Sequence, residues 1–441
     1  MKSATRILLV VGALAATSAV GYAQYSSLDL GKVFGSKSGQ SFLQALELLD
    51  QYYIKPVDTD KLLQGAVQGM AASLNDKFLY YFPPEEAKTQ QDDLQGEFFG
   101  IGAGIGVLNA DGTGPVIQDV YKDQPAARAG VQSGDLILKV NGEDVSKLSS
   151  SKAVAKIRGP KGTPVTITFG RGTTTYQATM TRSPITIVSV ETTMLPGNVG
   201  YVALNTFANQ KVFGQFGDAV DAMEKKGVNK LILDLRDNGG GLLTAGIAVA
   251  DKFLQQGPIV SLRDRGGKAQ VAGSAKKQAD DYTGKLVVLI NKNSASASEI
   301  VSGALQDTGR ATIVGETSYG KGVAQSVFTL PDGAQIDVVS QEWLTPKGRL
   351  IQNKGITPDV KVADNRYPTP VSFNGTNLTP GQKVTITVGG RTLDLTAGPK
   401  GDLTYTDPPK RRAPVNVQGV AVVDPKTDAE LARALSVLGQ Q

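Results

Sequence analysis

The chain has 441 residues and contains neither histidine nor cysteine. Ser-His-Asp and Cys-His catalysis both need an imidazole that exchanges a proton near neutral pH, so both are excluded, as are zinc sites built on His or Cys. The net charge of +5 comes from 46 basic and 41 acidic residues along the chain. Its one dense basic run, 410–412, is interpreted as a solvated loop, and we expect no nucleic-acid partner.

The N-terminus has the pattern of an export signal. Lys2 and Arg6 precede an apolar run at 7–20, and the sequence Gly-Tyr-Ala at 21–23 places small residues where a signal peptidase cleaves. We predict cleavage after residue 23 and an exported protein of the periplasm or cell envelope. An uncleaved segment that anchors the chain to the membrane remains the alternative, although 7–23 is short for a membrane span.

The composition changes along the chain in a way that predicts a multidomain α/β protein. Apolar residues recur at helical spacing before residue 98, short β-type runs follow, and strand and helix patterns alternate from residue 199. A segment rich in Thr, Gly and Pro then precedes an amphipathic helix. The expected regions are a signal peptide at 1–23, a helical region at 24–98, a β-rich domain at 99–183, an α/β core at 184–364, a β-rich insertion or module at 365–420 and a C-terminal helix at 421–441.

Three loops of the α/β region carry candidate chemistry. In the first, Ser296 stands between a buried strand and a helix, where the positive end of the helix favours a developing oxyanion. Ser296 and Glu299 also match a capping box, and this segment taken alone favours a structural role for Ser296 as a helix cap.

The second loop places Lys321 between two glycines, where the backbone can pack closely and direct the side chain inward. A lysine titrates near pH 10.4, so a lysine base would need its pKa lowered by roughly three pH units, or about 4 kcal/mol. Burial can supply this. An exposed loop lysine is the structural alternative. The spacing from Gly315 to Lys321 resembles a phosphate-binding loop, but Gly322 stands where Ser or Thr is required, and a strand follows instead of a helix.

The third loop, 234–241, ends a strand with Gly239, Gly240 and Gly241. Consecutive glycines can turn backbone N–H groups toward one point and form an oxyanion hole. The structural alternative is an ordinary strand–helix turn.

In this order, the motifs resemble those of the C-terminal processing peptidases, or tail-specific proteases. The matching segments are Asp-Leu-Arg-Asp-Asn-Gly-Gly-Gly at 234–241, Asn-Lys-Asn-Ser-Ala-Ser-Ala-Ser-Glu-Ile at 291–300, Gly-Lys-Gly-Val-Ala-Gln at 320–325 and Gly-Ile-Thr-Pro-Asp-Val at 355–360. The resemblance covers roughly residues 40–364 and the final helix. It implies a serine endopeptidase with a core like those of ClpP and crotonase, acting on polypeptides with exposed C-termini.

The resemblance also implies the roles of individual residues. Ser296 would be the nucleophile, Lys321 the general base, and Gln325 the residue that orients Lys321. Ala297 and Gly240 would supply oxyanion-hole N–H groups, although the choice within the glycine triplet stays open. No metal and no cofactor are expected.

The β-rich region at 99–183 resembles a PDZ domain, because Pro125–Gly130 and Gly134-Asp135 follow its Gly-rich loop. In such domains that loop, here Phe99, Gly100, Ile101 and Gly102, binds the C-terminal carboxylate of a peptide, which adds as a strand to a sheet edge. By the same resemblance, this domain gates the active site.

Two other classes of protein remain as alternatives. One is a peptide-binding scaffold with an inactive protease domain, which the intact set of Ser, Lys and Gln argues against. The other is a carboxylate-metal hydrolase, for which the sequence has no clustered acidic motif. A homo-oligomer is compatible with the sequence.

Overall fold

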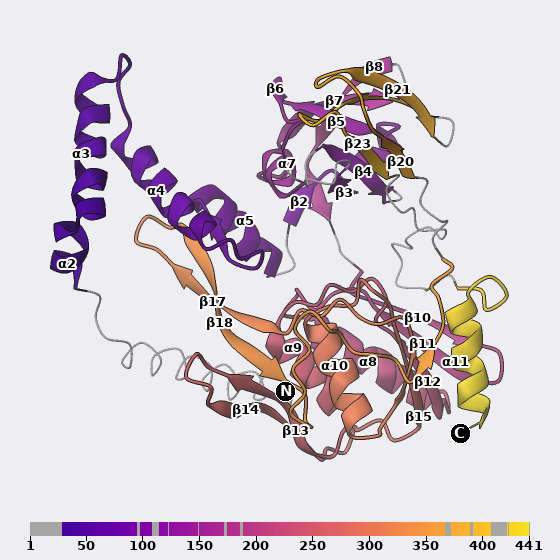
Figure 1. The fold of residues 1–441 in the computed structure, drawn as a ribbon. Helices are drawn as coiled ribbons and strands as arrows, with labels where there is room; N and C mark the ends of the chain where they lie inside the picture. Colours follow the sequence, from indigo (N-terminus) through magenta and orange to yellow (C-terminus); the bar gives the residue numbers. More distant parts are fainter. Residues whose placement is uncertain are drawn as a thin grey trace. The chain divides into compact units, whose positions relative to one another are not determined.

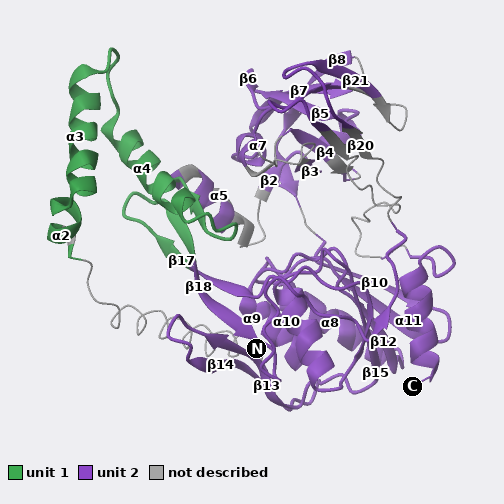
Figure 2. Ribbon diagram, viewed as in Figure 1, with its two compact units in different colours: residues 1–83, 327–338 green, residues 84–326, 339–441 purple. Residues whose placement is uncertain are grey.

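The computed structural model divides into two compact units, residues 1–83 with 327–338 and residues 84–326 with 339–441 (Figure 2). It describes residues 29–94, 98–107, 114–121, 123–148, 150–171, 174–185, 188–366, 372–388, 391–406, 421 and 423–440. The predicted export signal and the basic run at 410–412 lie outside these ranges.

The first unit contains the predicted N-terminal helices. They are α2 (Leu30–Gly35), α3 (Lys37–Tyr52) and α4 (Thr59–Ser73), followed by the short strand β1 (Tyr80–Phe82). The side chains of Ser36 and Asp58 cap α3 and α4 by accepting a backbone N–H in the first turn. β1 pairs with residues 335–337 of a hairpin that the sequence assigned to the α/β core. A three-residue strand needs a partner for its backbone groups, and periodicity could not indicate one more than 250 positions away.

The β-rich region follows helix α5 (Pro84–Leu94). Its main sheet has the order β3-β4-β5-β7-β8, with β6 paired to β5, while β2 pairs with β9. Asn141 and Gly142, a residue pair typical of tight turns, form the turn between β5 and β6, both with positive φ. The elements are β2 (Phe98–Gly100), β3 (Ala103–Val107), β4 (Pro115–Val120), α6 (Pro125–Arg128), β5 (Leu136–Val140), β6 (Glu143–Asp144), α7 (Ser150–Ile157), β7 (Pro164–Arg171), β8 (Thr174–Thr181) and β9 (Ser183–Ile185).

The α/β core is built on a six-stranded sheet of order β10-β11-β12-β15-β16-β19. All neighbouring pairs from β11 to β19 are parallel, and β10 is antiparallel to β11. The elements are β10 (Val190–Leu195), β11 (Val199–Leu204), α8 (Val212–Lys225), β12 (Lys230–Asp234), α9 (Leu243–Asp251), β13 (Gln256–Arg263), β14 (Ala269–Lys276), β15 (Lys285–Ile290), α10 (Ala297–Asp307), β16 (Thr312–Gly315), β17 (Val323–Thr329), β18 (Gln335–Leu344) and β19 (Val360–Lys361).

Both faces of this sheet are buried, which explains why its strands are continuously apolar. Along β12, Leu231 and Leu233 face the cluster formed with α8, α9 and α10, whereas Ile232 faces the helix α11 (Ala429–Gln440). Figure 1 shows α8, α9 and α10 on one side of the strands and α11 on the other. The predicted α/β fold class is confirmed.

This topology positions the three candidate loops. They follow the carboxyl ends of β12, β15 and β16, which are neighbouring parallel strands. Parallel strands end at the same edge of a sheet, and ligands of open α/β sheets bind at that edge. The loops carrying Gly240, Ser296 and Lys321 therefore meet.

The inserted segment forms two antiparallel strand pairs, as the sequence predicted for a small β module. β20 (Ser372–Gly375) pairs with β23 (Leu403–Thr406), and β21 (Lys383–Val388) pairs with β22 (Arg391–Thr396). Leu395 and Leu403 form its small apolar core. Within the described ranges, no helix has both the length and the apolar character of a membrane span.

Candidate active site

Ser296 occupies a sharp turn between β15 and α10. Its φ of 54° and ψ of −115° differ from the extended backbone of an ordinary N-cap. A non-glycine residue in such a conformation is held there by its surroundings, and strain of this kind gathers at functional sites. Ser296 and Glu299 also form the predicted capping box, in which the Ser296 N–H donates to Glu299 Oε2 at 2.8 Å.

The two neighbouring serines have structural roles. Ser294 Oγ donates to the Leu235 carbonyl oxygen at 2.8 Å, and Ser298 Oγ donates to the Asn238 carbonyl oxygen at 2.8 Å. Both side chains are fully buried, whereas Ser296 is half-buried. The outer serines thus fasten the Ser296 turn to the 234–241 loop, and the central one remains the candidate for chemistry.

Gly240 lies directly against this turn. A Cβ atom added to Gly240 would be 2.7 Å from the Ala295 carbonyl oxygen, 2.8 Å from Ser296 Cβ and 2.9 Å from the Ala297 nitrogen, and its φ is +94°. Only glycine fits there. The Gly240 N–H donates to Asn238 Oδ1 at 2.9 Å in this structure. The predicted oxyanion-hole role of Gly240 therefore stays a prediction, as does that of Ala297, whose N–H opens α10.

Lys321 is half-buried and its Nζ donates to Gln325 Oε1 at 2.9 Å. Gln325 is on β17, four residues later, which matches the predicted pairing. The Lys321 carbonyl oxygen accepts the indole N–H of the buried Trp343 at 2.9 Å. Backbone and side chain are therefore both held by neighbouring strands.

The glycines beside Lys321 permit close backbone packing, as expected. A Cβ on Gly320 would lie 2.9 Å from the backbone nitrogens of Lys354 and Gly355, and one on Gly322 would lie 2.5 Å from the Gln352 nitrogen. Residues 352–355 thus pack directly against the lysine loop, and Ile356 exchanges hydrogen bonds with Ser318 of that loop. This gives the fourth motif of the sequence a structural role.

Glu299 joins the serine turn to the lysine loop. Its Oε2 accepts the N–H of Ser296 at 2.8 Å and that of Lys321 at 2.9 Å. Its Oε1 accepts the Gly320 N–H at 2.7 Å and the Ser318 hydroxyl at 2.5 Å. Burial raises the pKa of Glu299, while these hydrogen bonds oppose the rise.

Sequence reasoning found Glu299 only as part of a cap. The signal that it missed is a charged residue in a helix whose residues 297–305 are small or apolar apart from Glu299 and are all buried, because a buried carboxylate needs buried donors. The donors come from a loop about twenty residues further along the chain, which no local pattern indicates.

Of the predicted peptide-binding loop, Phe99 and Gly100 belong to β2 and pair with β9, and Ile101 and Gly102 form the connection to β3. The carbonyl oxygens of Ile101 and Gly102 accept the N–H groups of Ala126 and Tyr121 at 2.7 and 3.0 Å. The N–H groups of the same two peptide planes, those of Gly102 and Ala103, must point the opposite way because each plane is trans. β3 is an edge strand of its sheet, and α7 packs against it. A peptide could therefore add along β3 with its carboxylate at these N–H groups.

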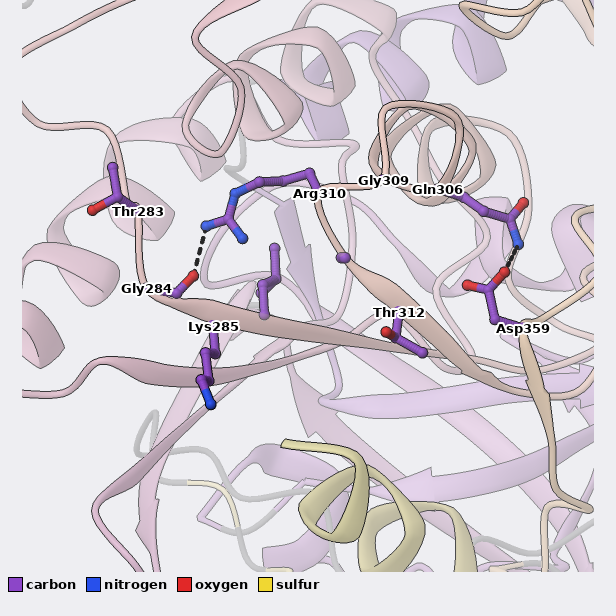
Figure 3. Close-up of a pocket in the computed structure, with 10 residues that line it drawn as sticks. Thr283, Gly284, Lys285, Gln306, Gly309, Arg310, Thr312 and Asp359 are labelled. Atoms are coloured by element: carbon purple, nitrogen blue, oxygen red, sulfur yellow. Dashed lines mark hydrogen bonds between the residues drawn. The ribbon is translucent and has the colours of Figure 1, made fainter. Parts of the chain in front are cut away.

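A shallow pocket of about 490 Å³ opens at the other edge of the core sheet, at the starts of β15 and β16 (Figure 3). Its polar groups bind one another or the backbone. Arg310 donates to the carbonyl oxygens of Tyr282 and Gly284 at 2.8 Å, and Gln306 donates to Asp359 at 2.9 Å. We assign it no part in the chemistry.

The fold and site define a serine peptidase that carries a PDZ domain. Residues 198–362 match Peptidase family S41, residues 116–171 match the PDZ domain, and residues 23–86 match the Activating protease CtpB N-terminal domain. The chain belongs to peptidase family S41, within the C-terminal processing peptidases that the sequence resembles.

Several relatives are similar over most of their length. A probable CtpA-like serine protease of Staphylococcus aureus (strain COL) is 34% identical over 369 residues, which are 82% of this chain and 73% of that protein. One of Staphylococcus epidermidis (strain ATCC 35984) is 33% identical over 368 residues, with 82% and 74% covered. The solved Photosystem II D1 C-terminal processing protease is 30% identical, with a TM-score of 0.52, and the match covers 74% of this chain and 94% of that one.

Proposed function

We propose that the chain is an endopeptidase with a Ser296–Lys321 dyad that cleaves exported polypeptides near their C-terminal tails. The observation that carries the proposal is the shared carboxylate of Glu299, which binds the backbone N–H groups of both residues. The similarity to a C-terminal processing protease supports the choice of tails as substrates.

In the proposed reaction, Lys321 Nζ takes the proton of Ser296 Oγ, and Oγ attacks the carbonyl carbon of the scissile bond. The Ala297 N–H at the start of α10 stabilises the oxyanion, together with Gly240 once its N–H leaves Asn238. The protonated Lys321 then gives its proton to the leaving amine. In the second half of the reaction, Lys321 takes a proton from water, whose oxygen attacks the acyl carbon. The bond to Ser296 Oγ then breaks, and Lys321 returns the proton to Oγ. Gln325 keeps Nζ directed during both steps.

The test compares cleavage of an unstructured polypeptide with an apolar tail. Ser296→Ala and Lys321→Ala should each abolish cleavage. The matched controls are Ser302→Ala, which removes a buried hydroxyl of the same helix, and Lys347→Ala, which removes an exposed loop lysine; both should cleave. Activity of Lys321→Ala equal to that of the wild type would refute the dyad. A wild type that cleaves no sequence at any pH would favour the scaffold.

We also propose that the PDZ domain recruits the tail and gates the site. The open edge of β3 and the outward N–H groups of Gly102 and Ala103 support recruitment. Substrates that differ only in a free or an amidated C-terminus test it, because amidation removes the carboxylate. Equal cleavage of both would refute recruitment through the carboxylate.

The location and assembly of the chain are proposals of the same kind. The N-terminal pattern supports export to the periplasm or cell envelope, with membrane association where the segment is retained. Mass spectrometry of the protein from membrane and soluble fractions distinguishes the chain cleaved after residue 23 from the chain that retains the N-terminal segment. In α3 and α4 no residue is buried, and Phe42, Leu43, Leu49, Leu63 and Met70 are exposed. This supports self-association of the N-terminal helices, which the solution mass of the chain with and without residues 24–74 tests.

A further inference from the structure

A buried charged cluster lies under the loop that contacts the candidate nucleophile. Its centre is Arg236, whose side chain is 1% exposed. Nε and Nη2 bind the Asp234 carboxylate at 3.0 and 2.6 Å at the end of β12. Arg236 therefore lies where β12 passes into the 234–241 loop (the glycine loop), four residues before Gly240.

The other side of Arg236 is bound by the C-terminal helix. Asp428 contacts Nη1 and Nη2 at 2.9 and 2.8 Å, and Glu430 Oε2 contacts Nη1 at 2.8 Å. Asp428 also accepts the Leu431 N–H at 2.9 Å, as the N-cap of α11. The start of this helix is thus fixed to the glycine loop through one guanidinium group.

A second contact comes from the residues that precede the β module. Arg366 Nη2 binds Asp237 Oδ2 at 2.8 Å, while Asn291 donates to Asp237 at 2.8 Å and to Asp364 at 2.9 Å. Asn365 also accepts the Ala429 N–H at 3.0 Å, which joins the segment before the β module to the start of α11. The segments on the two sides of the β module therefore both bind the 234–241 loop.

Glu430 reaches the lysine loop as well. Its Oε1 is buried and has no hydrogen-bond partner among the residues described. A Cβ on Gly315, where the lysine loop begins, would lie 2.8 Å from this oxygen. A buried carboxyl oxygen without a hydrogen-bond partner costs free energy of folding, so packing alone does not explain why Glu430 is at this position.

We propose that Asp428 and Glu430 make the C-terminal helix a positioning element for catalysis, holding the 234–241 loop against Ser296 through Arg236. The inference rests on the proposed function of Ser296. Neither acidic residue touches substrate. Their effect on the reaction comes from the placement of Gly240 beside the nucleophile.

The test uses Asp428→Asn, because asparagine still caps the helix but loses the charge that binds Arg236. Its matched control is Asp221→Asn, which disrupts an ion pair of 2.6 Å between the partly exposed Asp221 of α8 and the buried Lys252 at the end of α9. For each full-length variant, kcat, KM, the melting temperature and the rate at which a fluorophosphonate labels Ser296 are measured. Binding of a fluorescent tail peptide reports on the PDZ domain.

We expect Asp428→Asn to lower kcat and the labelling rate by about tenfold, less than the loss of about 10²–10³ that follows removal of an oxyanion donor, because the Gly240 N–H is displaced and not removed. KM and tail-peptide binding should stay within about twofold, as should kcat of Asp221→Asn, even where its melting temperature falls. Asp428→Glu, which restores the charge, should recover part of the labelling rate.

The proposal fails if Asp428→Asn loses stability to the same extent as Asp221→Asn while kcat and the labelling rate stay at wild-type values. If Asp428→Asn does not fold, Glu430→Ala with the same measurements decides between these results. Absence of Ser296 labelling in the wild type would instead refute the proposed function, so the two failures are distinguishable.

Discussion

Ser296 and Lys321 donate their backbone N–H groups to one and the same oxygen atom, Oε2 of Glu299. The two residues come from loops after different strands, and this atom links them without touching either reactive group. Their backbones thus set the relative position of the proposed nucleophile and the proposed base.

Glu299→Gln should therefore reduce both stability and turnover. An amide nitrogen at either oxygen position would face backbone N–H donors, and each buried donor left without an acceptor costs about 1–3 kcal/mol. We expect a lower urea midpoint and a fall in kcat of at least about tenfold. Glu342→Gln, which weakens a partly exposed pair with Arg263, is the control. Wild-type kcat in Glu299→Gln would contradict the linking role.

Gln325→Glu should move the pH dependence of the reaction. A carboxylate in place of the amide, 2.9 Å from Lys321 Nζ, favours the ammonium form and raises the lysine pKa. The acid limb of the kcat/KM profile should shift to higher pH, because a base must lose its proton to act. An unchanged limb would mean that Lys321 is not the titrating base. Gln325→Ala should lower kcat without this directed shift.

Gly240→Ala should inactivate the enzyme, whereas Gly239→Ala should not. The alanine methyl group at 240 would meet the Ser296 turn below 3.0 Å, with φ at +94°, but at 239 it would meet nothing within 4 Å. Labelling of Ser296 by a fluorophosphonate measures the difference. Comparable labelling of both variants would show that the close contact is unimportant for the nucleophile.

Gly102→Ala should abolish tail binding by the PDZ domain. A Cβ there would lie 2.2 Å from Gln124 Cβ. Gly130 has the same φ of +74° but open space around it, so Gly130→Ala separates backbone strain from collision. Fluorescence anisotropy with a tail peptide should show lost binding for the first variant and retained binding for the second. Equal losses would assign the effect to strain alone.

Glu430→Gln should change how stability depends on pH. Burial raises the pKa of Glu430 to about 8, with Arg236 opposing and Asp364 adding to the rise. A carboxyl that binds its proton more tightly in the folded chain makes folding less stable as pH rises from about 4.5 to 8. Gln at position 430 cannot ionise, so the variant does not lose this stability. The urea midpoint of the variant minus that of the wild type should therefore increase from pH 5 to pH 8. Parallel curves would contradict the raised pKa.

The core of the fold was predictable because β11, β12, β15 and β16 are continuous apolar runs with helical patterns between them. The resemblance carried by the ordered motifs also implied that Gln325 binds Lys321, and the structure shows this contact. The pairing of β1 with β18, the second role of Glu299 and the binding of α11 to Arg236 were not predicted. Each depends on a contact between distant segments, and polar pairs of this kind leave no periodicity in the sequence.

Arg236 and its partners Asp428 and Glu430 are 192 and 194 positions apart in the chain. Contacts between such distant residues form late, because the intervening chain must first lose most of its freedom. Until they form, the glycine loop lacks its support, even where the local strands and helices are complete. A folding molecule should therefore gain peptidase activity only after the C-terminal helix has bound Arg236.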